Sequence, residues 1–298
     1  MKQREPEASP LSRWTSRLAF FCLLLVIAAY FLHRLFGMPT PVAANVVVTA
    51  LLGATVAVIL GLTAGVRIWR HGGDGAARII VGLAIALLLL SGPLVVMAMA
   101  RSYPMIYDVS TDTASPPPFD VLALSRTPAE HSAAYPGAAF GEQQARAYPD
   151  LKPMILNRSQ AEAFDLVVEA LKRQSLRIVR EQEPNAETGA PGFIEAVDRT
   201  LIMGLYGDVA VRVSGTEESA RVDLRSASRF GQSDLGHNAE RLRLIMKEIV
   251  ARMEETVPTA DGERPERSKR KDKGKLKPEK EDDPKTSSRA RKPKRPVQ

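Results

Sequence analysis

The stretch Asp223–Arg241, "DLRSASRFGQSDLGHNAER", joins two different periodic patterns. Apolar and polar side chains alternate through residues 220–228, "ARVDLRSAS", which is typical of a half-buried strand. Beyond this stretch, apolar side chains recur at helical spacing, at Leu242, Ile245, Met246, Ile249, Val250 and Met253. The polar stretch is therefore expected to connect the last strand of a folded domain to its final helix.

The residues before this stretch predict the rest of the domain. Strand-like segments cover residues 176–182, 192–203 and 208–215, and short turns join them. Upstream, "SQAE" at residues 159–162 has the pattern of a capping box, and apolar side chains follow it at helical spacing. This order predicts an α+β domain with its core at residues 158–256, in which helices cover one face of an antiparallel sheet of about four strands.

Three long apolar runs precede the domain within residues 18–101, at about 18–36, 42–66 and 79–100. Runs of this length predict three transmembrane helices. The first run can also be read as a cleaved signal peptide, because small residues follow it in "PTPVAAN". Its length and the second run immediately after it favour a retained span. In the second run, Gly61 and Gly65 have the spacing that lets helices approach closely, and we favour packing within the chain over a dimer contact.

Basic residues predict how the apolar runs are oriented, since Lys and Arg accumulate on the cytoplasmic side. Residues 1–17 and the loop at 67–78 hold seven of them, whereas the opposite ends of the runs hold only Arg34 and Arg101. We therefore expect a multi-pass protein of the bacterial inner membrane, with residues 1–17 as a cytoplasmic tail and the carboxy-terminal domain in the periplasm. No Asp, Glu or Lys lies within the runs, which argues against a transporter.

Two segments flank the domain core. Residues 102–157 are rich in proline and also contain large apolar side chains, so they are expected to form an extended strap that packs along the domain. The alternative is a proline-rich peptide ligand. Residues 257–298 are expected to be disordered, because they contain almost no large apolar side chains. From position 261 onward they hold fifteen Lys or Arg and eight Asp or Glu.

This distribution of charge and hydrophobicity predicts the kinds of molecule that the chain contacts. The apolar runs imply a lipid bilayer. The basic tail would suit an anionic envelope polymer or a protein partner, whereas nucleic acid is not favoured because the expected topology places the tail outside the cytoplasm. Cys22 is the single cysteine, so no disulfide or zinc-ligand cluster can form within one chain. We expect no cofactor and no metal.

The polar stretch supplies the candidate site residues: Arg225, Ser226, Ser228, Arg229, Ser233, Asp234, His237 and Asn238. In a structural interpretation, the two arginines pair with Asp223 and Asp234, and Asp234 or Asn238 caps the final helix. In a ligand interpretation, the arginines bind an anion and the serine and asparagine side chains add hydrogen bonds. In a catalytic interpretation, Ser228 or Ser233 is a nucleophile, His237 its base and Asp234 the group that orients the base. No GxSxG turn supports a nucleophile, and we favour the structural interpretation.

The motif "RSASRFGQSDLGHNAER" resembles the signature of a bacterial family, the domain of unknown function 1499. The similarity covers roughly residues 107–253, and the core pattern RSxSRxGxSDxGxN fits residues 225–238. "IEAVDRT" and "GDVAVRV" also resemble the family. Many members have an upstream Pro-Asn-Cys-Val-Ser-Ser element, where this chain reads "TDTASPPPF", so no role of that thiol is carried over. The resemblance implies no established activity or cofactor.

Two functional classes follow from these patterns. The first is a membrane-anchored, non-enzymatic protein whose domain binds a ligand or partner outside the cytoplasm, with a role in the cell envelope. The second is an envelope hydrolase or transferase that uses the serine, aspartate and histidine residues at 226–238. The chain has no Walker loop, dinucleotide-binding glycine motif or HExxH motif, so we favour the first class.

Overall fold

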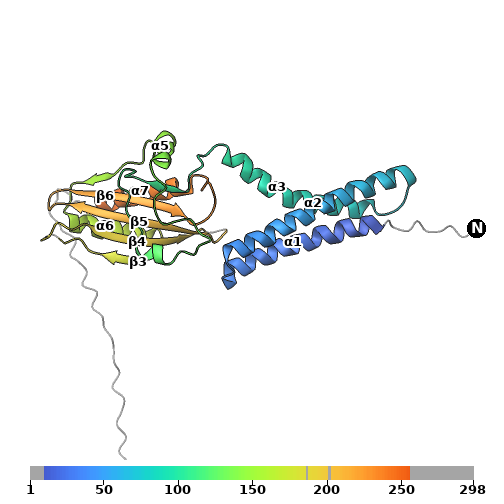
Figure 1. Ribbon diagram of the computed structural model, residues 1–298, viewed down its shortest axis with the longest axis horizontal. Helices are drawn as coiled ribbons and strands as arrows, with labels where there is room; N and C mark the ends of the chain where they lie inside the picture. Colours follow the sequence, from blue (N-terminus) through green and yellow to red (C-terminus); the bar gives the residue numbers. More distant parts are fainter. Residues whose placement is uncertain (1–9, 186, 201–202, 256–298) are drawn as a thin grey trace, which may run out of the picture. The chain divides into compact units, whose positions relative to one another are not determined.

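The computed structural model describes residues 10–185, 187–200 and 203–255. Three long helices come first: α1 (Pro10–Phe36), α2 (Thr40–His71) and α3 (Ala76–Ala100) (Figure 1). Each is long and apolar enough to cross a membrane. The predicted disordered tail at 257–298 lies outside the described residues, as do positions 1–9 of the predicted cytoplasmic segment.

Small side chains pack the three helices against one another. A Cβ atom at Gly61 would lie 2.7 Å from Cδ2 of Leu83, whereas one at Gly65 would have no atom within 4 Å. Gly61 is therefore used for packing within the chain, as favoured from the sequence. The buried cluster between the helices consists of alanines, namely Ala19, Ala54, Ala57 and Ala86.

The domain that follows is an α+β domain with an antiparallel six-stranded sheet, as the sequence predicts apart from the number of strands. Its helices are α4 (Val121–Leu124), α5 (Ala138–Ala147), α6 (Gln160–Arg173) and α7 (His237–Glu255). Its strands are β1 (Asp108–Ser110), β2 (Met154–Leu156), β3 (Arg177–Gln182), β4 (Gly192–Arg199), β5 (Tyr206–Gly215) and β6 (Ala220–Ser228).

Strands β3 to β6 form the expected meander, and the sheet order is β1-β6-β5-β4-β3 with β2 also paired to β6. The two extra strands, β1 and β2, come from the proline-rich segment. Each is only three residues long, so neither displays the alternation that identifies a strand in a sequence. Both pair with β6, which therefore has partners on both of its edges.

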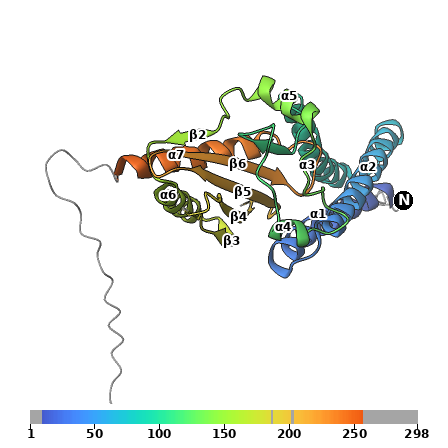
Figure 2. The ribbon, with the colours of Figure 1, turned by 60° about the vertical axis from the view of Figure 1, so that its left-hand side comes forward.

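Helices α6 and α7 cover one face of the sheet (Figure 2). The serine before α6 accepts a hydrogen bond from the backbone amide of Glu162, which is one of the two bonds of the predicted capping box. The core between the helices and the sheet is apolar and includes Phe164, Val167, Leu171, Val209, Val211, Leu224, Leu242 and Ile245.

The opposite face of the sheet is buried under the segment that carries α4. Phe119 and Leu122 of this segment pack against Val197, Ala210 and Ala227. Because both faces are covered, polar side chains on β4, β5 and β6 are also buried, among them Glu195, Asp208, Asp223 and Arg225. The proline-rich segment is thus an integral layer of the domain in this structure.

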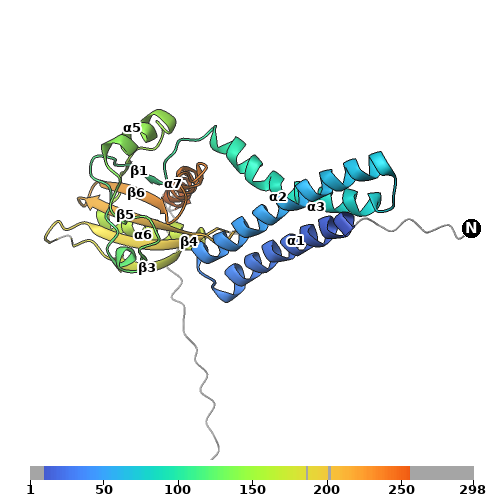
Figure 3. The same ribbon diagram turned by 45° about the vertical axis from the view of Figure 1, so that its right-hand side comes forward.

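Helix α5 lies beside β1 at the outer edge of the sheet (Figures 1 and 3). The side-chain amide of Gln144 donates to the carbonyl of Ser110 (2.6 Å), and its oxygen accepts from the amide of Ser110 (2.9 Å). This pair of bonds imitates a neighbouring strand. The side chain of Gln144 thereby forms hydrogen bonds with backbone groups at the edge of the sheet, where no further strand pairs among the described residues.

Candidate functional site

The predicted site residues lie on both sides of the sheet. Side chains alternate along a strand, so neighbouring residues of β6 point to opposite faces. Arg225 points to the face covered by α4, whereas Ser226 contacts α7 on the other face. The polar stretch therefore forms two separate groups of contacts.

Arg225 is buried on the α4 side and is fully engaged with the protein. Its Nε and Nη2 atoms donate to the carboxylate of Asp108 at 3.0 and 2.7 Å. The remaining bonds go to the carbonyls of Pro117 and Ala133, and the guanidinium stacks 4.4 Å from the centre of the Phe119 ring. With an exposed fraction of 2 %, Arg225 is not accessible to a ligand.

Arg229 makes the corresponding pair with β5. Its Nε and Nη2 atoms donate to Oδ1 of Asp208, while Arg126 donates to Oδ2 of the same carboxylate. Burial alone would lower the pKa of Arg229, but the hydrogen bonds and the charge of Asp208 raise it. Asp208 is therefore a completely buried anion held between two cations.

These pairs differ from the predicted ones, which joined Arg225 and Arg229 to Asp223 and Asp234. The carboxylate of Asp223 instead accepts bonds from Arg212 and Arg221. The reason is the register of the sheet, in which Asp108 and Asp208 both lie opposite Ala227. Each arginine is two residues away from Ala227 along the chain. It therefore lies diagonally across from an aspartate of the neighbouring strand and pairs with it.

On the other face, Asn238 connects β6 to α7. Its carbonyl oxygen accepts from Ser226 Oγ at 2.9 Å and from Arg241 Nη1 at 2.8 Å. Its amide nitrogen donates to the carbonyl of Tyr107 and to Ser228 Oγ. A single buried side chain therefore joins β6, α7 and the residue before β1, and both serines of β6 form structural hydrogen bonds.

The turn before α7 is closed by Ser233 and Asp234. The carboxylate of Asp234 accepts from the backbone amides of Gly236 (3.0 Å) and Asn238 (2.6 Å), which is the predicted cap. Burial raises the pKa of Asp234, although these two amide bonds act in the opposite direction. Ser233 Oγ donates to the carbonyl of Pro104 and accepts from the amide of Leu235.

A groove of about 770 Å³ opens at this end of the domain. Its volume is in the range of small-molecule sites. The walls come from the start of the domain, the end of α5, the β4–β5 connection and the first turns of α7. The lining residues are Tyr103, Tyr148, Thr200, Met203, Leu205, Asp234, Leu235, Gly236, His237, Glu240 and Arg243.

Tyr148 lines this groove, and its hydroxyl resembles that of Tyr135, which lies beside Arg225 on the other face. Its hydroxyl is buried and has no hydrogen-bond partner in the part of the chain that the structure describes. Tyr148 as a whole is 8 % exposed, and burial raises the pKa of its hydroxyl. A buried polar group without a partner costs free energy, so it is a candidate for contact with a bound molecule.

Beside Tyr148, only glycine fits at position 236. A Cβ atom at Gly236 would lie 2.7 Å from Cε1 of Tyr103 and 3.4 Å from the Tyr148 hydroxyl. The preceding residue, Leu235, has a φ of 53°, in the left-handed region that bulky residues rarely adopt. This backbone presents an apolar side chain to the groove.

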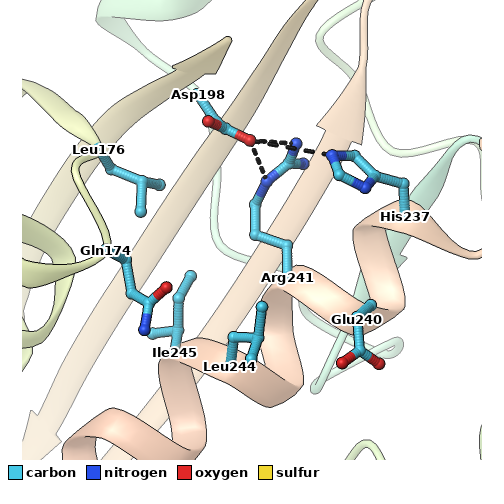
Figure 4. Close-up of a pocket in the computed structure, with 8 residues that line it drawn as sticks. All are labelled: Gln174, Leu176, Asp198, His237, Glu240, Arg241, Leu244 and Ile245. Atoms are coloured by element: carbon cyan, nitrogen blue, oxygen red, sulfur yellow. Dashed lines mark hydrogen bonds and ion pairs between the residues drawn. The ribbon is translucent and has the colours of Figure 1, made fainter. Parts of the chain in front are cut away.

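His237, the first residue of α7, lines this groove and two smaller hollows of about 110 and 180 Å³. Figure 4 shows that His237 and Arg241 both extend toward Asp198 of β4. Arg241 is bonded to Asp198 at 2.6 Å, whereas Nε2 of His237 lies 3.9 Å away. Burial and the charge of Arg241 lower the pKa of His237. The imidazole is therefore harder to protonate than a fully solvated histidine side chain.

Among the described residues of the polar stretch, the geometry offers no nucleophile–base pair. Within the described ranges, neither Ser228 nor Ser233 forms a hydrogen bond with His237, and the hydroxyl groups of both serines bond to other partners. Asp234 orients backbone amides and does not bond to the imidazole. These contacts correspond to a structural junction beside a groove, and they lack the hydrogen bonds of a catalytic triad.

No cluster of three or more metal-ligating side chains occurs among the residues described. The groove itself includes several residues that sequence reasoning missed. Tyr103 and Tyr148 each precede a proline, and this repeated Tyr-Pro pair could have identified both tyrosines in the sequence. Leu205, Glu240 and Arg243 carry no comparable signal, because only the fold brings them to the same groove.

Residues 108–249 match the model of a family described as "Protein of unknown function (DUF1499)". No curated protein matches the chain. The matched segment begins with β1 and ends within α7, so it contains every strand of the sheet together with both buried ion pairs. Residues 108–249 of this chain therefore belong to the DUF1499 family and follow three helices that are apolar enough to span a membrane.

Proposed function

We propose that this protein is a membrane-anchored binding protein whose α+β domain holds a ligand, without catalysing a reaction, in the groove at the start of α7. The observation that carries the proposal is the buried hydroxyl of Tyr148, a lining residue of this groove, which has no partner among the described residues. The absence of a serine–histidine hydrogen bond in the described part of the chain favours binding over hydrolysis.

The proposal places the domain in the periplasm of a bacterium, with a role in the cell envelope. Basic residues support this orientation, since Arg13, Arg17, Arg67 and Arg70 lie at the start of α1 and the end of α2. Trp14 and Trp69 lie at the same helix ends and are 60 % and 91 % exposed, as expected of side chains at a membrane interface. The domain follows α3 and would then lie on the opposite side.

The orientation can be tested with reporter fusions. Alkaline phosphatase is active only after export, so a fusion after residue 256 should be active. Green fluorescent protein at the same junction should be dark if it is exported by the general secretory route. A bright fluorescent fusion together with an inactive phosphatase would reverse the orientation.

Ligand binding can be tested by photo-crosslinking in living cells. p-Benzoylphenylalanine in place of Met203, a groove residue that is 60 % exposed, should yield an adduct of defined mass in the intact full-length chain. The control position is Leu124, which is 89 % exposed and lies on α4, outside the groove. The same adducts at both positions, or none at position 203, would contradict a ligand in the groove.

A further inference from the structure

The groove lies close to the end of an apolar helix. Tyr103, one of its wall residues, follows Ala100, the last residue of α3, by three positions. An extended chain spans at most about 3.6 Å per residue, so the Cα atom of Tyr103 is within about 11 Å of the helix end. If α3 crosses a bilayer, this wall of the groove is at the level of the lipid headgroups.

The lining of the groove is amphipathic. Apolar surface comes from Met203, Leu205 and Leu235, and Met203 is 60 % exposed. His237 adds a polar side chain to the lining, and Tyr148, another lining residue, holds its hydroxyl buried behind the surface of the groove. A ligand with a hydrocarbon part and a polar part would use both kinds of surface.

The charges in the groove disfavour an anionic ligand. Asp234 and Glu240 are acidic, and Arg243 is the only arginine or lysine among the lining residues that the structure describes. Arg243 is already held by the carboxylate of Asp150 at 2.7 and 3.0 Å. Arg225 and Arg229 are buried on the opposite face in ion pairs, and Arg241, on the α7 face, is paired with Asp198. A headgroup without net negative charge therefore fits best.

From these three observations we infer that the groove binds a membrane lipid with a neutral or zwitterionic headgroup, taken from the leaflet in which α3 ends. This inference rests on the proposed function. The hydrocarbon chain lies against Leu205 and Leu235, and the polar part reaches His237. Tyr103 stands beside the Tyr148 hydroxyl at Gly236, so displacement of its ring gives a headgroup access to that hydroxyl.

The experiment uses the full chain in nanodiscs that contain phosphatidylcholine with a photoactivatable diazirine in one acyl chain. Mass spectrometry then locates the labelled peptides. Labelling of α1–α3 provides an internal control for reconstitution. We expect additional labelling of the peptides that contain Leu205 and Leu235. Labelling confined to the three helices would overturn the inference.

The test variant is Leu235→Asn, because asparagine tolerates the left-handed backbone better than leucine. This variant should fold as well as the parent and lose at least several-fold of the groove labelling. The matched control is Leu124→Asn, at an exposed leucine outside the groove, which should leave labelling unchanged. Equal groove labelling in the parent and in Leu235→Asn would also overturn the inference.

The crosslinking at Met203 separates the two possible failures. If position 203 captures a water-soluble molecule while the lipid probe labels only the helices, the binding function stands and the lipid assignment is wrong. If neither experiment detects an occupant, both proposals are wrong. If a phosphatidylglycerol probe labels the groove more strongly than phosphatidylcholine, the inferred headgroup charge is wrong.

Discussion

On the α4 side of the sheet, the completely buried Asp208 accepts hydrogen bonds from Arg126 and Arg229, whereas at the start of α7 the buried hydroxyl of Tyr148 has no partner among the described residues. Both regions hide polar atoms from water. In the first, each buried charge is paired, so the free energy of burial is offset within the protein. In the second region, the free energy of burying the hydroxyl is not offset by a hydrogen bond within the described residues, as at a site where a bound molecule supplies the partner.

The comparison shows that the polar character of a sequence motif does not identify its binding residues. Arg225 and Arg229 are the most conspicuous charges of the signature, yet they are buried in pairs on the α4 face. His237 and Leu235 are less conspicuous and line the groove. Four measurements test this contrast between paired charges and an unpaired hydroxyl.

Removal of Asp208 should have the largest effect. Asp208→Ala leaves two buried guanidinium groups without their carboxylate, which costs on the order of 3–5 kcal/mol. Thermal unfolding of the full chain in a mild detergent should show a midpoint lower by about 10 °C. The control is Asp150→Ala, which removes an exposed partner of Arg243 and should cost less than about 1 kcal/mol. Similar losses in both variants would show that burial does not distinguish the two pairs.

Removal of the cap of α7 should have an intermediate effect. Asp234→Ala leaves the amides of Gly236 and Asn238 without their acceptor, and a lost cap costs about 0.5–2 kcal/mol. No larger loss is expected, because the structure gives Asp234 no arginine partner within the described residues. Asp234→Asn keeps an acceptor oxygen and should retain most of the stability. A loss above about 3 kcal/mol in the alanine variant would indicate an ion pair after all.

Removal of the Tyr148 hydroxyl should stabilise the protein. Tyr148→Phe eliminates a buried, unpartnered polar group, whose burial costs about 1–3 kcal/mol, so we expect a gain of about 1 kcal/mol in the absence of ligand. Tyr135→Phe is the matched control, since the hydroxyl of Tyr135 is also buried without a partner among the described residues, and Tyr135 lies outside the groove. Both variants should raise the unfolding midpoint. Destabilisation by Tyr148→Phe alone would mean that its hydroxyl already has a partner.

The smallest effect should be a change in pH dependence at His237. Its pKa is lowered in the folded protein, mainly by burial. In the unfolded chain the pKa is about 6.5, so as the pH falls below this value the unfolded chain takes up more protons at His237 than the folded protein does. The stability that the neutral imidazole contributes is therefore present above that pH and is lost as the pH falls. In unfolding midpoints measured between pH 7.5 and 5, His237→Gln should decline less than the parent. Parallel curves would contradict the assigned shift. The effect is small because the side chain is 51 % exposed.

The periodic elements of the domain were predictable from the sequence. The alternation in β5 and β6 and the helical stripes of α6 and α7 are local patterns, and the structure contains all four elements. The cap at Asp234 was predictable for the same reason, since it joins residues within one turn. The two short strands that border β6 were missed, because three residues display no period.

The partners of the arginines could not be predicted from the sequence. Arg225 and Asp108 are 117 positions apart, and their meeting depends on the pairing of β1 with β6. The sequence offered nearer aspartates, but Asp223 bonds to Arg212 and Arg221, and Asp234 accepts backbone amides. The choice among several candidate carboxylates is decided by strand register, which is a property of the assembled sheet.

Three apolar helices and an α+β domain with a capped final helix follow from the sequence alone, because hydrophobic period and capping depend on residues close together in the chain. Which charges are buried in pairs, and where a groove opens, follow only from the tertiary structure. The groove combines Tyr103, Tyr148, the β4–β5 connection and the first turns of α7, which come from four separate parts of the chain. Long-range packing brings these parts together, and no local pattern encodes that contact.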